Sequence, residues 1–401
     1  MTPLGTPLKT SLPRVLWPLM FGNIVIGTGV MMVTGILTEI SSSLHVSIAT
    51  AGQLISTSAI CTCIGAPLFA AWVAGWDRQK LLTASLLWYS LLHALAALSD
   101  QFSALLTWRA LAMAGAAIFT PQAASCIGLL VPPAQRGRAI TFIFLGWSVA
   151  SVIGTPFGAW LGGTWGWRYA FGLISMLSLI SAAWLWRSLP AGIVPPPLSR
   201  AAWHTTLGSR TLMLTVSVTM ASAAGQFVLF SYMAPYLKTI LGVSTTNLSL
   251  LLLMFGCAGF VGNAFVARHI DRISPSRSVM ISLACMACGL GFFSLVTSAA
   301  WLALAFLPWG LGLFSTNSAQ QARLVQLAPD LASASIALNS SAIYAGQAIG
   351  AGMGGWLILH QGLTVLPGYA LLGMVLAMTV SWQASRYAKS HPLHQSAGVH
   401  G

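Results

Sequence analysis

Twelve long apolar stretches occupy most of this chain, and they restrict its fold more than any other feature. Each is 18 to 29 residues long, enough for an α-helix to cross about 30 Å of hydrocarbon. Only 6% of the residues are charged, against about 25% in an ordinary soluble domain. Backbone groups inside hydrocarbon must satisfy one another, so the sequence predicts an all-α membrane protein. The predicted spans are 15–39, 48–74, 81–98, 103–131, 139–161, 169–189, 211–236, 246–267, 278–298, 301–327, 331–359 and 367–387.

The cysteines indicate neither a disulfide framework nor a cofactor site. All six lie inside predicted spans, where a thiol mostly behaves as a small apolar side chain. Cys285 and Cys288 share a helix face, which leaves a metal or redox pair as an alternative. The first span, 15–39, is too long for the apolar region of a signal peptide, so we expect it to be retained.

Basic residues predict the orientation of the chain. With the N-terminus inside the cell, fifteen of the 18 Lys and Arg residues lie at or beyond the cytoplasmic ends of the spans, Arg323 among them. Only Arg168 and Lys238 lie outside, while Arg109 lies within the membrane. This asymmetry predicts that both termini are cytoplasmic. The net charge of +13 is then a signal of topology and not of a nucleic-acid partner. As a separate expectation, the protein is a monomer in a bacterial inner membrane.

The chain contains an internal repeat. A polar, proline-rich break at 190–210 separates an N-terminal half, 1–189, from a C-terminal half, 211–401. The sequence therefore predicts two pseudo-symmetric six-helix bundles joined by a cytoplasmic linker, with a binding site between them near the midplane. A shift of 196 positions superposes Gly154 on Gly350 and Gly158 on Gly354, and a slip of two aligns Asp77 and Arg78 with Asp271 and Arg272.

Small residues form a ridge along the span 139–161. Gly146, Gly154 and Gly158 are spaced in multiples of four, with Pro156 between them, and Gly350 and Gly354 belong to the matching ridge of the second half. Such ridges let two helix backbones approach closely. Two interpretations remain open and are compatible, namely static packing and a low-friction surface on which the two halves rock.

These features resemble the major facilitator superfamily, specifically its twelve-helix drug:proton antiporter branch and the arabinose and sugar efflux permeases. The resemblance covers roughly residues 15–387 and rests on the glycine motif around Pro156, on "GWR" at 166–168, on "VPPAQRGRA" at 131–139 and on Arg109. It implies alternating access between two bundles. It also implies that Asp77, in the shortened loop motif "GWDRQK", accepts bonds from a neighbouring helix N-terminus and latches the outward-open state.

Acidic residues are scarce inside the membrane. Of five carboxylates, only Glu39 falls within a predicted span, at its outer end. Many members of that branch carry another acid at the position of Val30. Proton coupling, if present, therefore depends on Glu39 or on His93, which we expect at the same depth as Arg109 because the two flank the hairpin turn at Gln101 evenly. Alternatively, Glu39 is a solvated helix-end carboxylate and His93 a packing residue.

Polar side chains inside the spans are candidates for a substrate cavity. They suit an uncharged or amphipathic solute, although bonding between helices is the alternative for each. The candidates are Asn23, Gln53, Arg109, Gln122, Gln226, Tyr232, Asn317, Gln320, Asn339 and Gln347.

The sequence thus predicts a secondary active transporter that exports a small organic solute, such as a drug or sugar, in exchange for protons. The alternative is a facilitator or importer that works without a gradient. We do not expect an enzyme, because no span holds a pair of carboxylates and no Gly-Lys-Ser/Thr phosphate loop is present. We expect no cofactor and no metal; His391, His394 and His400 form only a dispersed metal-binding alternative.

Overall fold

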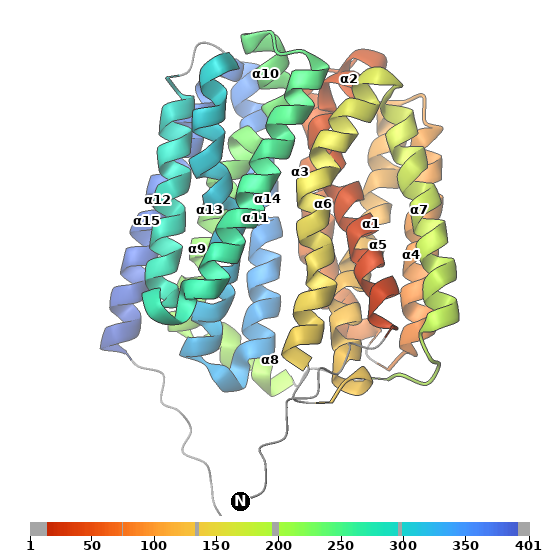
Figure 1. The fold of residues 1–401 in the computed structure, drawn as a ribbon, viewed down its shortest axis with the longest axis vertical. Helices are drawn as coiled ribbons and strands as arrows, with labels where there is room; N and C mark the ends of the chain where they lie inside the picture. The colour runs from red at the N-terminus through yellow and green to blue at the C-terminus, as the bar shows by residue number, and fades with distance from the viewer. Residues whose placement is uncertain (1–13, 74, 133–135, 195–199, 296–298, 392–401) are drawn as a thin grey trace, which may run out of the picture.

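The described residues form a bundle of long α-helices that run between two ends of the molecule (Figure 1). The computed structural model describes residues 14–391, apart from 74, 133–135, 195–199 and 296–298. Within this part of the chain, eleven helical segments are long and apolar enough to cross a membrane. The remaining predicted span, 301–327, coincides with α13 (Ala299–Leu327), a helix of 29 residues. The prediction of an all-α membrane protein is confirmed.

The helices follow the predicted spans closely. Figure 1 shows α2 and α10 together at one end, the α2–α10 end. It shows α8 at the opposite end, where α1 begins and α15 ends; we call this the terminal end. The first half contains α1 (Leu16–Gly35), α2 (Leu37–Ser43), α3 (Ile48–Trp72), α4 (Arg78–Ala97), α5 (Phe102–Leu130), α6 (Arg136–Thr164) and α7 (Trp167–Ser188). The second contains α9 (Arg210–Phe230), α10 (Met233–Leu241), α11 (Thr245–Ile273), α12 (Pro275–Phe293), α13, η2 (Pro329–Leu331), α14 (Ala332–Gln361), η3 (Leu363–Val365) and α15 (Leu366–Ser390).

The first span of each half is broken near the α2–α10 end, where the sequence predicted continuous helices. Ile36 separates α1 from α2 with φ −112° and ψ 12°. Tyr232, at the equivalent position of the repeat, precedes α10 with φ −115° and ψ 18°. The same backbone conformation therefore recurs in both halves and starts a short helix that can point in a new direction.

The predicted linker contains a short helix, α8 (Arg200–Gly208), which the sequence did not suggest. Residues 195–199 of the linker lie outside the described part of the chain. The boundaries 189 and 211 stay predictions, although α7 ends at Ser188 and α9 begins at Arg210.

Each half is held together by its own helix pairs, and the halves meet along two more. In the first half α1 packs against α6, and in the second α9 packs against α14, which is the equivalent pairing. Across the middle of the molecule α3 lies along α14 and α6 along α11. These two contacts are the surfaces on which one half can move against the other.

The small-residue ridge lies inside a half and not between the halves. A Cβ on Gly158 would lie 2.7 Å from the Cβ of Met32 in α1, and one on Gly154 would lie 3.1 Å from the Cα of Thr28. Gly146 likewise faces α1, while Gly350 and Gly354 face α9. The ridge is therefore packing within each bundle, and the interpretation as a rocking surface between halves is wrong because these glycines already have helix backbones against them.

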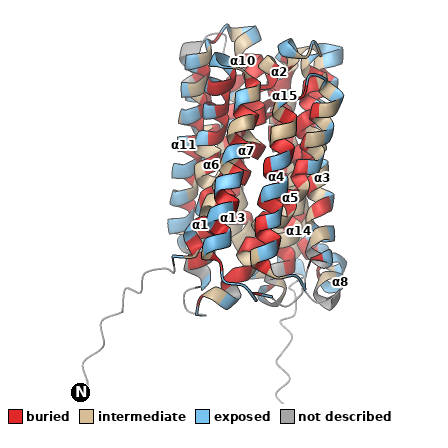
Figure 2. Cartoon of the chain, turned by 90° about the vertical axis from the view of Figure 1, so that its right-hand side faces the viewer, coloured by how far each residue is buried: buried red, intermediate tan, exposed pale blue. Residues whose placement is uncertain are grey.

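Exposed and buried residues are distributed as a membrane requires. Figure 2 shows buried positions turned toward neighbouring helices and exposed positions along the outer surface. Large apolar side chains are among the exposed ones, for example Leu68, Trp72, Leu359 and Leu372. An apolar surface this extensive indicates contact with lipid.

Candidate functional site

An ion pair joins the two halves at the α2–α10 end. Glu39, in the first turn of α2, accepts a hydrogen bond through Oε1 from the Nζ of Lys238 in α10. The two side chains are only 15% and 18% exposed, respectively. The second oxygen of Glu39, Oε2, is buried and has no partner among the described residues. The helix breaks at Ile36 and Tyr232 bring the two charges together, because they let α2 and α10 leave the lines of α1 and α9.

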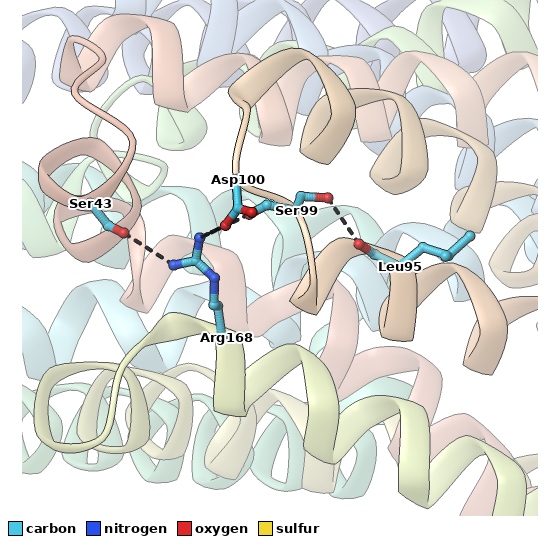
Figure 3. A network of polar contacts seen from close by, with 5 residues as sticks. All are labelled: Ser43, Leu95, Ser99, Asp100 and Arg168. Carbon is cyan, nitrogen blue, oxygen red and sulfur yellow. Dashed lines mark hydrogen bonds and ion pairs between the residues drawn. The ribbon is translucent and has the colours of Figure 1, made fainter.

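Lys238 was not among the candidate residues, although the sequence held a signal for it. Lys238 and Arg168 were the only two cations predicted outside. Each of the two now pairs with a carboxylate. Arg168, at the start of α7, binds Asp100 at 2.9 Å and reaches Ser43 of α2 at 3.3 Å (Figure 3). That second network stays within the first half and is more exposed than the Glu39–Lys238 pair.

Close contacts across the halves extend from the middle of the helices to the same end. A Cβ on Gly256 of α11 would lie 2.7 Å from the Cα of Val152 in α6. Gly163 lies directly against the Thr245 side chain, and Gly52 of α3 lies against the Tyr232 hydroxyl. These positions bring α6 onto α11 and α3 onto the α9–α10 junction, so the halves are shut at the α2–α10 end.

Arg109 and His93 lie at the same depth, as expected, and are in contact. The Nη1 of Arg109 lies 3.3 Å from His93 Nε2 and donates to the backbone oxygen of Gly29 at 2.8 Å. Nη2 donates to the oxygen of Val30 at 3.3 Å. Arg109 Nε is buried and has no partner among the described residues. Gly29 also lets Tyr89 approach α1 closely, because a Cβ there would run into the Tyr89 hydroxyl.

These contacts define the protonation of His93. A guanidinium can only donate hydrogen bonds, so Nε2 must be the accepting nitrogen. Nδ1 then carries the proton and donates to the backbone oxygen of Tyr89, 2.8 Å away. The ring is therefore neutral in this arrangement. It packs between the tilted rings of Tyr89 and Phe171, whose centroids are 4.1 and 5.7 Å away.

Arg109 does not form a cavity wall in this structure. Its side chain is 2% exposed and lies in the seam of α5 with α1 and α4. The prediction that a guanidinium lines the cavity is wrong for this conformation, because the α1 carbonyls and His93 enclose the group.

The other polar candidates of the first half fall into three situations. Asn23 ties helices together, donating to the backbone oxygen of Ile143 at 3.0 Å and accepting from Thr120 at 2.9 Å. Gln122 is buried and accepts from Ser125 at 3.4 Å, one turn along α5. Gln53 is exposed on the same face of α3 as Ile60, so it lies outside the buried seams.

Three candidates of the second half belong to one buried network. Asn339 of α14 accepts from Thr219 of α9 at 2.5 Å and donates to Asn317 of α13 at 3.1 Å. Gln320 donates to Thr219 at 3.1 Å and to the backbone oxygen of Thr215 at 2.8 Å. This network bonds helix to helix, which was the alternative to a cavity role.

Gln226, Gln347 and Tyr232 complete the set. Gln226 is 9% exposed, and its Oε1 is buried without a partner in the described residues. Gln347 is also buried, on α14. The Tyr232 hydroxyl donates to the backbone oxygen of Ala351 at 2.8 Å. An acceptor left unpaired in the membrane is costly, so Gln226 is the candidate that most needs a ligand or water.

Arg323, which the sequence places at a cytoplasmic end, lies one turn before the end of α13 and is buried. It is 1% exposed and donates to the Ser385 hydroxyl at 3.1 Å and to the Ser381 hydroxyl at 3.3 Å, which ties α13 to α15. Arg109 in the first half and Arg323 in the second are thus both buried and bound to a neighbouring helix. The polar run around Gln320 was the available signal that α13 is still buried at Arg323.

Asp77 contacts the linker instead of another helix of the bundle. It caps α4 by accepting from the Lys80 backbone N–H at 3.1 Å, and it accepts from the Gly192 N–H. Partial burial would raise the pKa of the Asp77 carboxyl, but the backbone donors and the Lys80 charge outweigh it and lower that pKa. The expected bond to a neighbouring helix N-terminus is replaced by these two contacts.

Arg78 and its counterpart in the second half, Arg272, lie in different surroundings. Arg78 begins α4 and is buried, donating to the backbone oxygens of Val73 and Trp76 at 3.0 and 2.7 Å. Arg272 is exposed in the last turn of α11. The side chain of Asp271 lies outside the described part.

Among the described residues, no three His, Cys, Asp or Glu side chains come together as a metal site. All six cysteines are free thiols. His394 and His400, two of the three tail histidines, lie outside the described residues.

Comparison with known proteins agrees with this architecture. The sequence matches the family model described as Major Facilitator Superfamily over residues 19–351. It is 27% identical to the uncharacterized MFS-type transporter YbcL of Bacillus subtilis (strain 168) over 90% of this chain and 92% of that protein. It is 31% identical to a chloramphenicol resistance protein of Streptomyces lividans over 65% of this chain and 68% of that protein.

Further similarities extend over nearly the whole chain. The inner membrane transport protein YdhP of Escherichia coli (strain K12) is 26% identical over 93% of this chain and 97% of that protein. Among solved structures, a D-xylose-proton symporter superposes with a TM-score of 0.75 at 16% identity, covering 94% of this chain and 99% of that chain. An inward-facing bacterial homolog of the lysosomal transporter Spinster gives 0.74 at 17% identity, covering 95% and 98%. These two likenesses bear on the fold alone.

Proposed function

The chain belongs to the major facilitator superfamily of membrane transporters, and on that premise we propose that it exports a small organic solute in exchange for protons. We further propose that it works as a monomer in a bacterial inner membrane with both termini cytoplasmic, as the distribution of Lys and Arg predicts. The observation that carries the proposal is the buried contact between His93 and Arg109, because it couples a titratable side chain to the position of α1.

Protonation of His93 disrupts this contact. Nε2 would become a donor facing another donor, and two cations would meet where the neutral ring now accepts. Like charges about 4 Å apart repel by about 4 kcal/mol at an effective dielectric constant of 20. Arg109 would then move away, releasing the Gly29 and Val30 carbonyls of α1. α1 packs along α6, which forms part of the interface between the two halves. A proton on His93 therefore acts on a helix that contacts this interface.

An uncharged solute fits the surroundings better than a charged one. Arg109 and Arg323 already donate to helix groups, and the neutral amide of Gln226 offers a buried acceptor that has no partner among the described residues. The likeness to a chloramphenicol resistance protein makes chloramphenicol the first solute to test. Gln226→Leu removes that acceptor. It should reduce the binding of the solute more than it reduces the transport of a smaller analogue that has no donor group.

Proteoliposomes with an imposed pH gradient test the coupling. Solute exchange should follow the gradient in the wild type and lose that dependence in His93→Gln, while Glu39→Gln tests the second candidate. His269→Gln is a matched control, because His269 makes the same bond from Nδ1 to the carbonyl four residues earlier but is exposed on α11. Exchange that ignores the gradient in the wild type would end the coupled proposal.

A facilitator is the alternative, and one observation favours it. Val30 places no carboxylate beside Arg109, whose Nη atoms bind backbone oxygens instead. Solute flux of equal rate with and without the gradient, in either direction, selects this alternative.

A further inference from the structure

We infer that Glu39 and Lys238 form the gate at the α2–α10 end, that protonation of Glu39 opens it, and that Glu39 is not the site that carries the exchanged proton. This inference rests on the proposed alternating access, but its test requires no solute. It assigns a function to Lys238 and separates two roles that the sequence left together at Glu39.

The pair is placed where a gate must be. Glu39 and Lys238 come from opposite halves, on the short helices that follow the two equivalent breaks. The contacts of Gly163 with Thr245 and of Gly52 with Tyr232 lie at the same end, so the ion pair closes a surface on which the halves already touch. Opening this end requires the two charges to separate.

Few other charged groups act on the pair. α2 packs against α1, α3 and α10, and α10 packs also against α11 and η3. The sequences of α1 and η3 contain no titratable residue, and the cysteines of α3 lie more than three turns from its start. In α10 the titratable groups are Lys238 and Tyr236. In α11 they begin at Cys257, also more than three turns in, followed by Arg268, His269, Asp271 and Arg272.

Two groups at the end of α2 complete the surroundings. His45 follows α2, and Arg168, which reaches Ser43, is occupied by Asp100. Lys238 is therefore the cation that balances Glu39 in the described part of the protein.

Protonation of Glu39 removes its attraction to Lys238 and leaves the Lys238 charge without compensation. A neutral Glu39 no longer compensates Lys238, which is 18% exposed, and a largely buried ammonium without a counter-ion is unfavourable. Separation of α2 from α10 gives Lys238 access to water. Protons on the α2–α10 side therefore favour the open gate.

The direction in which protonation of Glu39 shifts the gate decides which residue carries the exchanged proton. If a proton on Glu39 favours the open gate, closing the gate must expel that proton, by reciprocity. The proton leaves before the site is shut, to the side from which it came. An exchanged proton needs a group that keeps it while this end closes, and His93, which contacts Tyr89, Arg109 and Phe171, is not part of the ion pair.

Labelling of a cysteine at the contact between the two halves measures gate opening. The six native cysteines are first replaced by serine, and Ser56→Cys provides a reporter on α3, at the contact of α3 with Gly352 of the other half. Intact cells are treated with a membrane-impermeant maleimide. Leu98→Cys, in the exposed turn after α4, gives the labelling rate of an open site at each pH and reports whether this end faces the medium.

A charge-reversal cycle is the decisive experiment. With the native pair, Ser56→Cys should label slowly at neutral pH and faster, relative to Leu98→Cys, as the external pH falls. Glu39→Gln and Glu39→Lys should each label at least about tenfold faster without that pH dependence. Lys238→Glu should label at least about tenfold faster at neutral pH, and the double reversal should label slowly again. Asp100→Asn, which breaks the ion pair within one half, should behave as the native protein.

Two results would overturn the inference. One is slow labelling in Glu39→Gln and in both single reversals. The other is gradient-driven solute exchange that Glu39→Gln abolishes and His93→Gln leaves intact, which would make Glu39 the carrier. Failure of the proposed function, by contrast, appears as exchange that never follows the gradient, whatever the labelling shows.

Discussion

Gly158 of α6 lies so close to Met32 of α1 that a Cβ on the glycine would be 2.7 Å from the Met32 Cβ. Gly158→Leu should therefore force the two helices apart and lower the free energy of unfolding by about 1–3 kcal/mol. Thermal unfolding in detergent measures the loss. Gly172→Leu in α7 is the control, because nothing lies within 4 Å of the Cβ position there. Equal midpoints for the two variants would contradict tight packing of α1 on α6.

The indole of Trp309 is fully buried, and its Nε1 has no partner among the described residues. Trp309→Phe removes an unpaired donor while keeping most of the ring that packs on Phe255 and Phe306. We expect a stability within about 1 kcal/mol of the wild type, since the lost contacts and the relieved donor offset each other. Trp309→Ala should cost about 3–5 kcal/mol. Similar losses in both variants would show that the indole donor is satisfied.

Arg323 should contribute to stability through its bonds between α13 and α15. Arg323→Ala leaves a cavity and removes the donors to Ser381 and Ser385, for which we expect a loss of about 1–3 kcal/mol. Arg323→Lys should keep only part of the stability that Arg323→Ala loses, because an ammonium cannot reproduce the forked set of guanidinium donors. Arg386→Ala, at the exposed end of α15, should change stability by less than about 0.5 kcal/mol. The midpoints of thermal unfolding rank the three variants.

The contact between the linker and Asp77 should be complete at neutral pH and should be lost as the pH falls. The pKa of Asp77 is lowered from 3.8 by the backbone donors that outweigh its partial burial, so the folded state favours the ionised form. The contribution is complete at neutral pH and is lost only as the pH falls below 3.8 and through the lowered pKa. Hydrogen exchange of the Gly192 amide reports the bond directly. Exchange at neutral pH should be faster in Asp77→Asn, and an unchanged rate would show that the contact is not kept in solution.

The spans were predictable from the sequence because hydrocarbon accepts only helices, and length with hydropathy suffices to find them. The broken helices were not, because Ile36 and Tyr232 are ordinary residues inside apolar runs. Only the repeat, which aligns these two positions, could have suggested the breaks.

Residues within one hairpin were predictable, and residues joined by tertiary packing were not. The contact of His93 with Arg109 followed from equal distances to the turn at Gln101. The partner of Glu39 lies 199 positions away in the sequence, on the other half. The glycine ridge showed that a close approach occurs, but its partner could be any helix, and the structure identifies α1.

The breaks at Ile36 and Tyr232 have a consequence for the symmetry of the protein. Two copies of one segment that faced each other across a two-fold axis would set like charge against like charge. Glu39 and Lys238 carry opposite charges at positions that do not correspond in the two copies. The attraction between the two bent segments is therefore not part of the repeat and depends on a difference between the two halves.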